Sequence, residues 1–470
     1  MAIRGHPNII PCEVAGGATI SRLLQGAPTS DIEKYQLPLP DDLTQEICKD
    51  FNFQTIQNVA RSGIFSKTDL VVSRKLQNCI ILIAPEFSDG ISEYFRHGEL
   101  FLEIGEDGLK SFFKYFGDHV KKIEFWYNDS VLCNEITKKI IKKYAKNLEE
   151  LRLSFLNDRD GEFWIQISKG ANDIIFPEVK KLQFWGDSHR SEFNLNSIFP
   201  KLESLELVSV TNQNCLRNVK GLKELKLYTK LEEKQLDHIF RNNVNMTEIH
   251  LSEVKRGDTM QSIAKYLTKL ETLAVRKPGE NFLLRTNNNP VCELPFVKNL
   301  EITYHGMYEQ IITNNLSFDV PHLKKLTLIE RSPNDRIVNF IKRFKKLETV
   351  ELFISGCDAV KFIKELKHIK EFATIFHRMD GFRSVENMFK NFDEESELQI
   401  LKLVDFDDYF FSVNYKYAIE DINDDIMKEI NIHLKESMKS TWTLSSHGVQ
   451  IGTPEKYLKF ERNPCKSSKK

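Results

Sequence analysis

The sequence lacks the closely spaced cysteines that mark a disulfide-stabilised or zinc-stabilised protein. Structural zinc sites draw their ligands from paired cysteines and histidines a few residues apart. No C-x-x-C pair exists among the eight cysteines of the 470-residue chain, which are Cys12, Cys48, Cys79, Cys133, Cys215, Cys292, Cys357 and Cys465. We therefore expect no structural metal, and we expect a reduced, intracellular protein.

Long apolar runs and an excess of one charge are also missing. The beginning of the sequence has no apolar run long enough for a signal peptide, and no later segment is apolar enough to span a membrane. The 66 basic and 67 acidic residues leave a formal net charge of −1. Nucleic-acid-binding domains normally carry a basic excess. We expect a cytoplasmic or nuclear protein, or both, that binds neither nucleic acid nor membrane.

Catalytic motifs are missing as well. The sequence contains no H-E-x-x-H, no G-x-S-x-G and no phosphate-binding G-x-x-x-x-G-K-[ST] motif. Gly16 and Gly17 are adjacent but are not followed by the lysine and hydroxyl residue of a phosphate loop. His368 and His377 lie near each other in the sequence without a further ligand pattern. We therefore expect no catalytic residue, no metal and no cofactor, so the chain is not expected to be an enzyme.

What the sequence does contain is a repeated phrase, apolar-x-x-apolar-x-apolar, as in Leu202, Leu205 and Leu207. Successive phrases begin about 20 to 31 residues apart, which is the spacing of leucine-rich repeats. Several are preceded by an apolar residue and proline, as in Phe176-Pro177 and Phe199-Pro200. The phrases begin at Val120, Leu148, Val179, Leu202, Leu222, Met246, Leu270, Val297, Leu323, Leu347, Ile369 and Leu398.

Each phrase predicts a short strand with one buried side. Leu205 and Leu207 alternate with Glu206, so the leucines face the core and the glutamate faces out. Helical patterns lie between the strands. In residues 336–344, Ile337, Phe340, Ile341 and Phe344 share one helix face. Similar patterns occupy residues 108–116, 135–144, 236–242, 260–267, 360–366 and 385–389.

A single strand–helix unit cannot bury its apolar side, but stacked units share one continuous core. The sequence therefore resembles leucine-rich-repeat proteins, which implies an α/β solenoid with a parallel sheet inside and helices outside. Residues 79–83 and 100–104 are also predicted strands, and we expect the second to open the sheet. The expected parts are a flexible leader at 1–30, a helical unit at 31–75, the solenoid at 76–405, a helical cap at 406–440 and a tail at 441–470.

The helical unit before the repeats has its own pattern. Pro40 stands at a predicted helix start, followed by Asp41 and Asp42 in the first turn, where acidic side chains suit the helix dipole. An apolar stripe and a second short helix follow. The stretch resembles the first half of an F-box, and the matching residues are Leu39, Pro40, Leu43, Ile47, Phe51 and Ile56. In the second half, Ser62-Gly63 and Ser66 replace the Val-Cys and Trp that are common in that family.

An F-box followed by leucine-rich repeats is similar to the substrate receptors of SCF-type ubiquitin ligases. That resemblance implies that the helical unit binds a Skp1-type adaptor and that the repeats hold a target protein, which is unknown, for ubiquitin transfer by other subunits. Three alternatives remain open. The helical unit could be a cap that closes the solenoid. The chain could be a protein-binding scaffold without a ligase, or an enzyme whose site matches no known motif.

The positions left free by the repeat are the candidates for partner binding. The residue after the last apolar position of each phrase is often aromatic or aliphatic, and exposed groups of this kind mark interaction sites. From this column we selected Trp126, Trp185, Tyr228, Arg276 and Phe353 as a partner-binding concave face. Alternatively, loops cover the column and it belongs to the core. The neighbouring column has mixed charges, typical of a solvated surface or a polar rim, and includes Glu124, Arg152, Glu206, Lys226, His250, Glu301 and Lys402.

Overall fold

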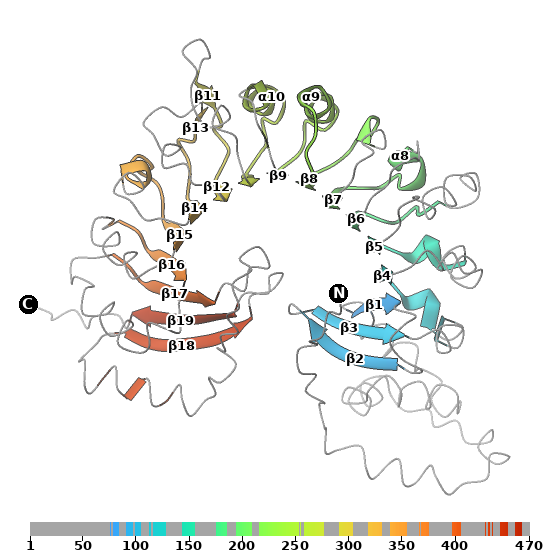
Figure 1. Cartoon of the computed structure of the whole chain (residues 1–470), viewed down its shortest axis with the longest axis horizontal. Helices are drawn as coiled ribbons and strands as arrows, with labels where there is room; N and C mark the ends of the chain where they lie inside the picture. Colours follow the sequence, from blue (N-terminus) through green and yellow to red (C-terminus); the bar gives the residue numbers. More distant parts are fainter. Residues whose placement is uncertain are drawn as a thin grey trace, which may run out of the picture. The chain divides into compact units, whose positions relative to one another are not determined.

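The computed structural model describes the strands of the repeats and part of their connections (Figure 1). The described residues are 76, 79–83, 91–96, 99–104, 112–113, 116–127, 143–155, 175–185, 194–208, 216–252, 254, 258–276, 291–303, 318–330, 339–354, 366, 368–375, 397–405, 428, 431–432, 435, 442–449 and 456–462. The expected leader and the F-box-like unit lie outside this set. The chain divides into two compact units, with unit 1 reaching Leu202 and including Val210–Cys215, and unit 2 formed by Glu203–Ser209 and Leu216–Lys470.

Unit 1 contains a mainly parallel sheet. Its described strands are β1 (Cys79–Ile83), β2 (Ile91–Arg96), β3 (Glu99–Ile104), β4 (Lys122–Tyr127), β5 (Glu150–Phe155) and β6 (Lys181–Trp185). They pair in the order β2-β3-β1-β4-β5-β6, and only the β2–β3 pair is antiparallel. Short helical segments in its connections are η2 (Gly117–His119), η4 (Ala145–Asn147) and α8 (Leu195–Ile198).

Our expectation that residues 100–104 open the sheet was wrong. These residues do form β3, but β1 lies between β3 and β4, and Ile81 of β1 pairs with Ile123 of β4. The reason is burial, because all five residues of β1 are at most 1% exposed. A strand that is apolar on both faces belongs in the interior of a sheet, where both of its edges are also hydrogen-bonded.

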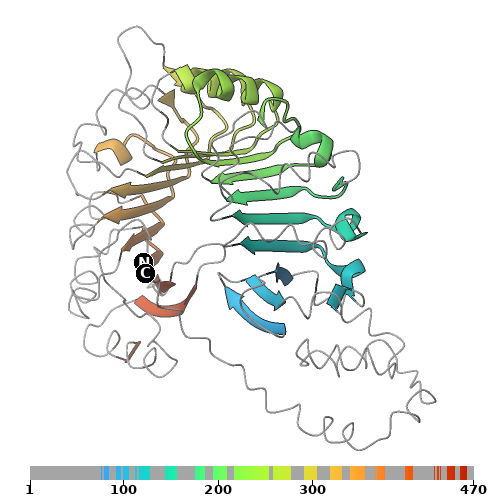
Figure 2. The same ribbon diagram turned by 45° about the vertical axis from the view of Figure 1, so that its right-hand side comes forward.

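Unit 2 continues the same design over more strands (Figure 2). Its described strands are β7 (Ser204–Val208), β8 (Glu224–Tyr228), β9 (Glu248–Ser252), β10 (Thr272–Arg276), β12 (Asn299–Thr303), β14 (Lys325–Glu330), β15 (Thr349–Ile354), β16 (Glu371–Ile375), β17 (Ile400–Asp405), β18 (Trp442–Val449) and β19 (Lys456–Arg462). From β7 to β17 each of these strands pairs in parallel with the next. Two short strands, β11 (Cys292–Glu293) and β13 (Phe318–Asp319), pair separately.

The apolar positions of the phrase form the core, as the sequence predicts. Leu205 pairs with Leu225, and Ile249 pairs with Leu273, so equivalent side chains stack from strand to strand. All four are completely buried. Thr374, which takes the last apolar position in β16, is also buried at 2% exposure, and its hydroxyl has no hydrogen-bond partner. Burial therefore follows the position in the phrase even where the residue is polar.

A backbone hydrogen-bond pattern fixes how the repeats stack. The carbonyl oxygen of Lys223 accepts from the N–H groups of Thr247 and Glu248, at 2.8 and 3.2 Å. In unit 1 the carbonyl oxygen of Lys121 accepts in the same way from Glu149 and Glu150, at 2.8 and 3.1 Å. The Thr247 hydroxyl group also donates to the Lys223 carbonyl oxygen, at 3.3 Å. The backbone bonds themselves do not depend on the side chain at each position.

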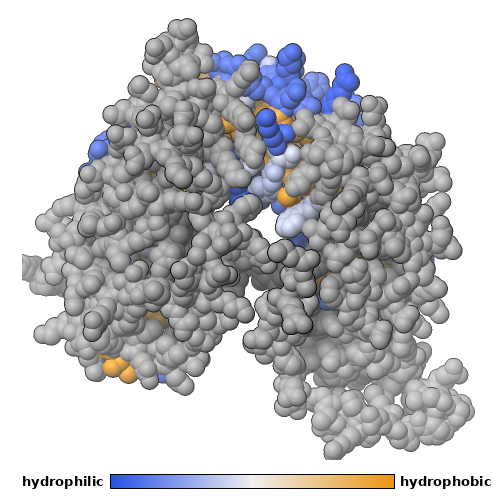
Figure 3. All heavy atoms as spheres, in the orientation of Figure 1, coloured by the Kyte–Doolittle hydropathy of each residue, from blue (hydrophilic) through white to orange (hydrophobic). Residues whose placement is uncertain are grey.

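Two helices in the connections of unit 2 were expected from the sequence. Helix α9 (Glu233–Asn242) and helix α10 (Asp258–Tyr266) contain the residues predicted at 236–242 and most of those at 260–267, which confirms these two predictions. The helices pack against each other, and α9 buries Leu236, Ile239 and Phe240. The outer surface of this part of unit 2 is mainly hydrophilic (Figure 3). Residues 112, 113, 116 and 339–341 are also helical, whereas most of the other expected helices lie outside the described residues.

The end of unit 2 differs from our expectation of a tail at 441–470. Strands β18 and β19 form an antiparallel hairpin, and β19 pairs antiparallel with β17. Phe460 of β19 pairs with Leu401 and is 1% exposed, and Trp442 and Leu444 of β18 are also buried. The free edge of β17 would otherwise leave hydrogen-bonding groups unpaired. Of the expected cap at 406–440, residues 428, 431–432 and 435 are described, and they are helical.

Candidate functional site

The side chains proposed for partner binding are distributed over both units. Trp126 and Trp185 belong to β4 and β6 of unit 1. Among the residues that the structure describes, Trp185 is one of the large apolar residues that are clearly exposed, at 41%. Tyr228, Arg276 and Phe353 belong to β8, β10 and β15 of unit 2. The surroundings of the Trp126 and Phe353 side chains lie outside the described part of the structure. Both Tyr228 and Arg276 are partly exposed, so neither has been absorbed into the core.

Within unit 2, Tyr228 and Arg276 are brought together. The guanidinium carbon of Arg276 lies 4.7 Å from the centre of the Tyr228 ring, which is a cation–π contact. The two residues come from β8 and β10, with β9 between them. Ser252 of β9 pairs with Arg276, and it immediately follows Leu251, the partner of Leu227. Because Ser252 is small, Arg276 can extend over it to the tyrosine ring.

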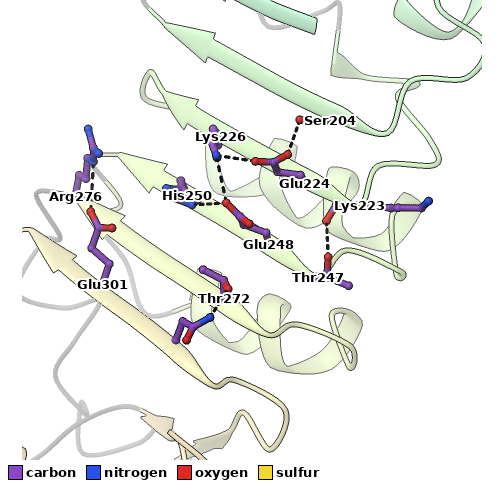
Figure 4. Close-up of polar contacts among 11 residues, drawn as sticks. Ser204, Lys223, Glu224, Lys226, Thr247, Glu248, His250, Thr272, Arg276 and Glu301 are labelled. Atoms are coloured by element: carbon purple, nitrogen blue, oxygen red, sulfur yellow. Dashed lines mark hydrogen bonds and ion pairs between the residues drawn. The ribbon is translucent and has the colours of Figure 1, made fainter. Parts of the chain in front are cut away.

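A carboxylate lies on the other side of Arg276. The Nε atom of Arg276 is 3.8 Å from Oε1 of Glu301 on β12 (Figure 4). This contact is an ion pair, but it is too long for a hydrogen bond. The hydroxyl group of Thr303 donates to the same Glu301 oxygen at 3.3 Å. The Arg276 Nε atom is buried without a hydrogen-bond partner. The guanidinium group is thus held by the ring and by a loose ion pair.

Two residues of the neighbouring charged column, Lys226 and His250, form a network with the carboxylates that lie two positions before them on the same strands. Lys226 Nζ lies 2.6 Å from Glu224 Oε1 and 3.2 Å from Glu248 Oε1, and the Ser204 hydroxyl donates to Glu224 Oε2 at 2.7 Å (Figure 4). His250 Nε2 is 2.9 Å from Glu248 Oε1. An ionised carboxylate only accepts hydrogen bonds, so Nε2 of His250 carries the proton in this contact.

The network in unit 2 could have been anticipated from one signal. Glu224 and Lys226 have a Glu-x-Lys spacing on one strand, and Glu248 and His250 have a Glu-x-His spacing on the next. Residues two apart on a strand share a face, and equivalent residues on paired strands are close neighbours. The sequence alone did not tell us that these strands are adjacent in the same register, which the pairing of Lys226 with His250 establishes.

These contacts change the ionisation of the groups involved. The pKa of Glu248 falls to about 2, mainly because His250 donates a hydrogen bond and also because Lys226 is close, although partial burial opposes the change. Burial disfavours the charged form of Lys226, but its contacts with Glu224 and Glu248 outweigh this and raise its pKa. Burial raises the pKa of the Tyr228 hydroxyl group, although the positive charge of Arg276 opposes this.

Unit 1 has a similar charged group on its own sheet. Arg152 Nε lies 2.6 Å from Glu150 Oε1, and Arg152 Nη1 lies 3.8 Å from Glu124 Oε2. Lys181 Nζ is 3.6 Å from the same oxygen of Glu150. The carboxylates of Glu124 and Glu150 are nearly buried. Charged side chains on the sheet face are therefore paired in both units, which limits the cost of removing them from water.

Replacing Glu248 by glutamine is expected to remove part of the acid sensitivity of unit 2. A carboxyl group whose pKa is lowered by folding stabilises the protein above its unfolded pKa of about 4.5, and this contribution disappears as the pH falls toward 2. The destabilisation by Glu248→Gln should therefore be on the order of 1 kcal/mol at pH 7, because partial exposure weakens the contacts, and close to zero at pH 2.

Urea unfolding of both proteins between pH 7 and pH 2 would measure this difference. Glu271→Gln is a matched control, because the Glu271 carboxylate forms an exposed ion pair with Lys298 at 2.9 Å and lies outside the network. An equal cost of Glu248→Gln at every pH would contradict the expected link between this carboxylate and the stability of the fold.

Within the described part of the chain, no group of three or more histidine, cysteine, aspartate or glutamate residues could hold a metal ion. The six F-box-like residues lie outside the described part of the structure; they are Leu39, Pro40, Leu43, Ile47, Phe51 and Ile56. No helix among those described is both long enough and apolar enough to span a membrane.

The sequence matches no model of a known protein family, and no curated protein matches it.

Proposed function

We propose that this chain is a non-catalytic adaptor, an F-box/leucine-rich-repeat substrate receptor of an SCF-type ubiquitin ligase. The observation that carries the proposal is the regular stacking of the repeats. In each unit, equivalent positions of the apolar phrase pair strand by strand, and the same backbone hydrogen bonds join one repeat to the next. Stacking of this kind supports a solenoid, and the extended sheet face of a solenoid suits the binding of another protein.

The sheet face of unit 2 supports a role in protein binding. It contains tyrosine and arginine, the residue types that dominate the binding energy of protein interfaces. Tyr228 and Arg276 stay partly exposed and contact each other at 4.7 Å, so both lie where a partner protein could reach them. The exposed Trp185 gives unit 1 a candidate contact of its own.

The ligase part of the proposal rests on the F-box-like sequence pattern. In it, Leu43, Ile47 and Phe51 form the apolar stripe that would contact a Skp1-type adaptor, together with the Leu39-Pro40 start and Ile56. The target protein held by the repeats is unknown, and transfer of ubiquitin would be performed by other subunits. The alternative function is a leucine-rich-repeat scaffold that binds proteins without associating with a ligase.

Binding to the adaptor should be lost when the apolar stripe is made acidic. Purified protein is expected to retain a Skp1-type adaptor at micromolar concentration, and the double change Leu43→Asp, Ile47→Asp should weaken binding at least about a hundredfold, or about 2.8 kcal/mol. The reason is that two carboxylates would have to be buried in an apolar contact. A pull-down with titration of the adaptor measures the effect, and circular dichroism checks that the repeats remain folded.

A matched control introduces the same charges away from the stripe. Gln45 and Lys49 lie on the opposite side of the predicted helix, so Gln45→Asp, Lys49→Asp should leave binding within about threefold of the unmodified chain. If the unmodified chain does not bind the adaptor at micromolar concentration, the scaffold function is favoured instead. If both double variants bind equally well, the stripe is not the contact surface.

A further inference from the structure

The polar face of β7–β12 in unit 2 has an excess of negative charge. On strands with alternating burial, the first, third and fifth residues share this face. Among them are four carboxylates and two permanent cations, which leaves two excess negative charges (4 − 2) when His250 is neutral. The carboxylates are those of Glu206, Glu224, Glu248 and Glu301, and the cations are Lys226 and Arg276.

The two cations of this face are held very differently. Lys226 contacts two carboxylates within 3.2 Å and is firmly paired. Arg276 has its nearest carboxylate contact at 3.8 Å, and its buried Nε atom makes no hydrogen bond. Arginine normally uses its planar group to form short, paired hydrogen bonds with carboxylates. Arg276 is therefore the weakly held cation of the face.

The Tyr228 ring is the place where a cation is favoured. An aromatic face attracts a guanidinium or ammonium group, and Arg276 occupies this position at 4.7 Å. The negative charges of Glu206 and Glu301 both act on Tyr228, where they favour its neutral form. The positive charges of Arg276 and Lys226 act on the same ring. If Arg276 leaves the ring, the two carboxylates favour another cation in its place.

We propose that Tyr228 is the anchor of a cation-binding position on this face, where an arginine or lysine side chain of a partner protein replaces Arg276 on the ring. In the free chain, Arg276 occupies the position that the partner's cation takes. On binding, Arg276 swings away from the ring, and the carboxylates of Glu206 and Glu301 flank the incoming charge. The inference deepens the proposed function and rests on it, because it defines the chemistry of the protein segment that the repeats hold.

The experiment uses the full-length chain labelled with fluorotyrosine and observed by fluorine NMR. The probe is an end-blocked nine-residue peptide of glycine and serine with three arginines, and the matched probe has glutamate in place of each arginine. The Tyr228 signal is assigned by its loss in Tyr228→Phe. We expect the arginine peptide to shift this signal, with an effect that weakens as salt is added, and the glutamate peptide to leave it unchanged.

Two variants test whether Arg276 is displaced by the cation of the partner or contacts the partner itself. Arg276→Ser removes the competing cation, so it should tighten binding of the arginine peptide at least about threefold. Glu301→Gln removes a flanking charge and should weaken binding by a similar factor. Weaker binding in Arg276→Ser, or a preference for the glutamate peptide, would overturn the proposal and make Arg276 itself the anchor for an acidic partner.

The proposed cation-binding position would also be overturned if millimolar arginine peptide caused no shift of the Tyr228 signal. Thermal unfolding of both variants checks that they are folded, and Glu301→Gln keeps the size and shape of the side chain. Because this test does not involve residues 39–56, failure of cation binding leaves adaptor binding intact. Failure of adaptor binding, in turn, leaves the Tyr228 result unaffected.

Discussion

Replacing Asn243 by alanine should lower the free energy of unfolding by about 3 kcal/mol, because it removes three buried hydrogen bonds at once. The Asn243 amide nitrogen donates to the carbonyl oxygens of Val219 and Ile239, at 2.9 and 2.8 Å. Its side-chain oxygen accepts from the N–H of Leu222 at 2.9 Å. Asn243 is 2% exposed, so water cannot easily replace these bonds.

The position of Asn243 explains why the effect should be large. It follows α9 and fastens the end of that helix to the turn that precedes β8. In that turn Gly221 has a φ of 87°, a left-handed conformation that other residues rarely adopt. One side chain thus supports two consecutive repeats. Urea unfolding followed by circular dichroism would measure the loss.

Two further variants test the assignment to hydrogen bonding. Asn245→Ala changes an exposed asparagine two residues after Asn243. The Asn245 side chain accepts a surface hydrogen bond from Lys269 at 2.8 Å, and its replacement should cost less than about 0.5 kcal/mol. Asn243→Asp keeps the acceptor but loses both donors and should be as damaging as alanine. A cost of Asn243→Ala below about 1 kcal/mol would mean that the three bonds contribute little net stability.

Replacing Gly117 by alanine is expected to destabilise unit 1 by about 2 kcal/mol through overpacking. A Cβ atom at this position would lie 2.5 Å from Cε1 and Cζ of the Tyr144 ring, a distance that requires the ring to move. Tyr144 is 3% exposed and packs against Phe113, with ring centres 5.5 Å apart. The ring therefore has no free space into which it could shift.

A double-mutant cycle separates this clash from other effects of glycine replacement. In a Tyr144→Ala background the ring is gone, and Gly117→Ala should then cost less than about 0.5 kcal/mol or become slightly stabilising, because alanine restricts the unfolded chain. Urea unfolding of the four proteins gives the coupling. An equal cost in both backgrounds would place the cause in the backbone conformation of Gly117 instead of in its contact with Tyr144.

The sequence by itself determined the strands of the repeated phrase and the buried positions within them. The apolar phrase predicted Leu205, Leu225 and Ile249 as core residues, because alternation along a strand is a local property. The helices at 236–242 and 260–267 followed from the spacing of their apolar residues for the same reason. Tyr228 and Arg276 were also selected from their place in the phrase, although not as a pair.

Only the tertiary structure decided how segments distant in the sequence meet. The insertion of β1 between β3 and β4, and the pairing of β19 with β17, depend on which edges are left open when the other strands have paired. The position of Arg276 on the Tyr228 ring depends on the strand that lies between them and on its register with both neighbours. Such contacts arise from the register of three strands together, so no single stretch of the sequence contains them.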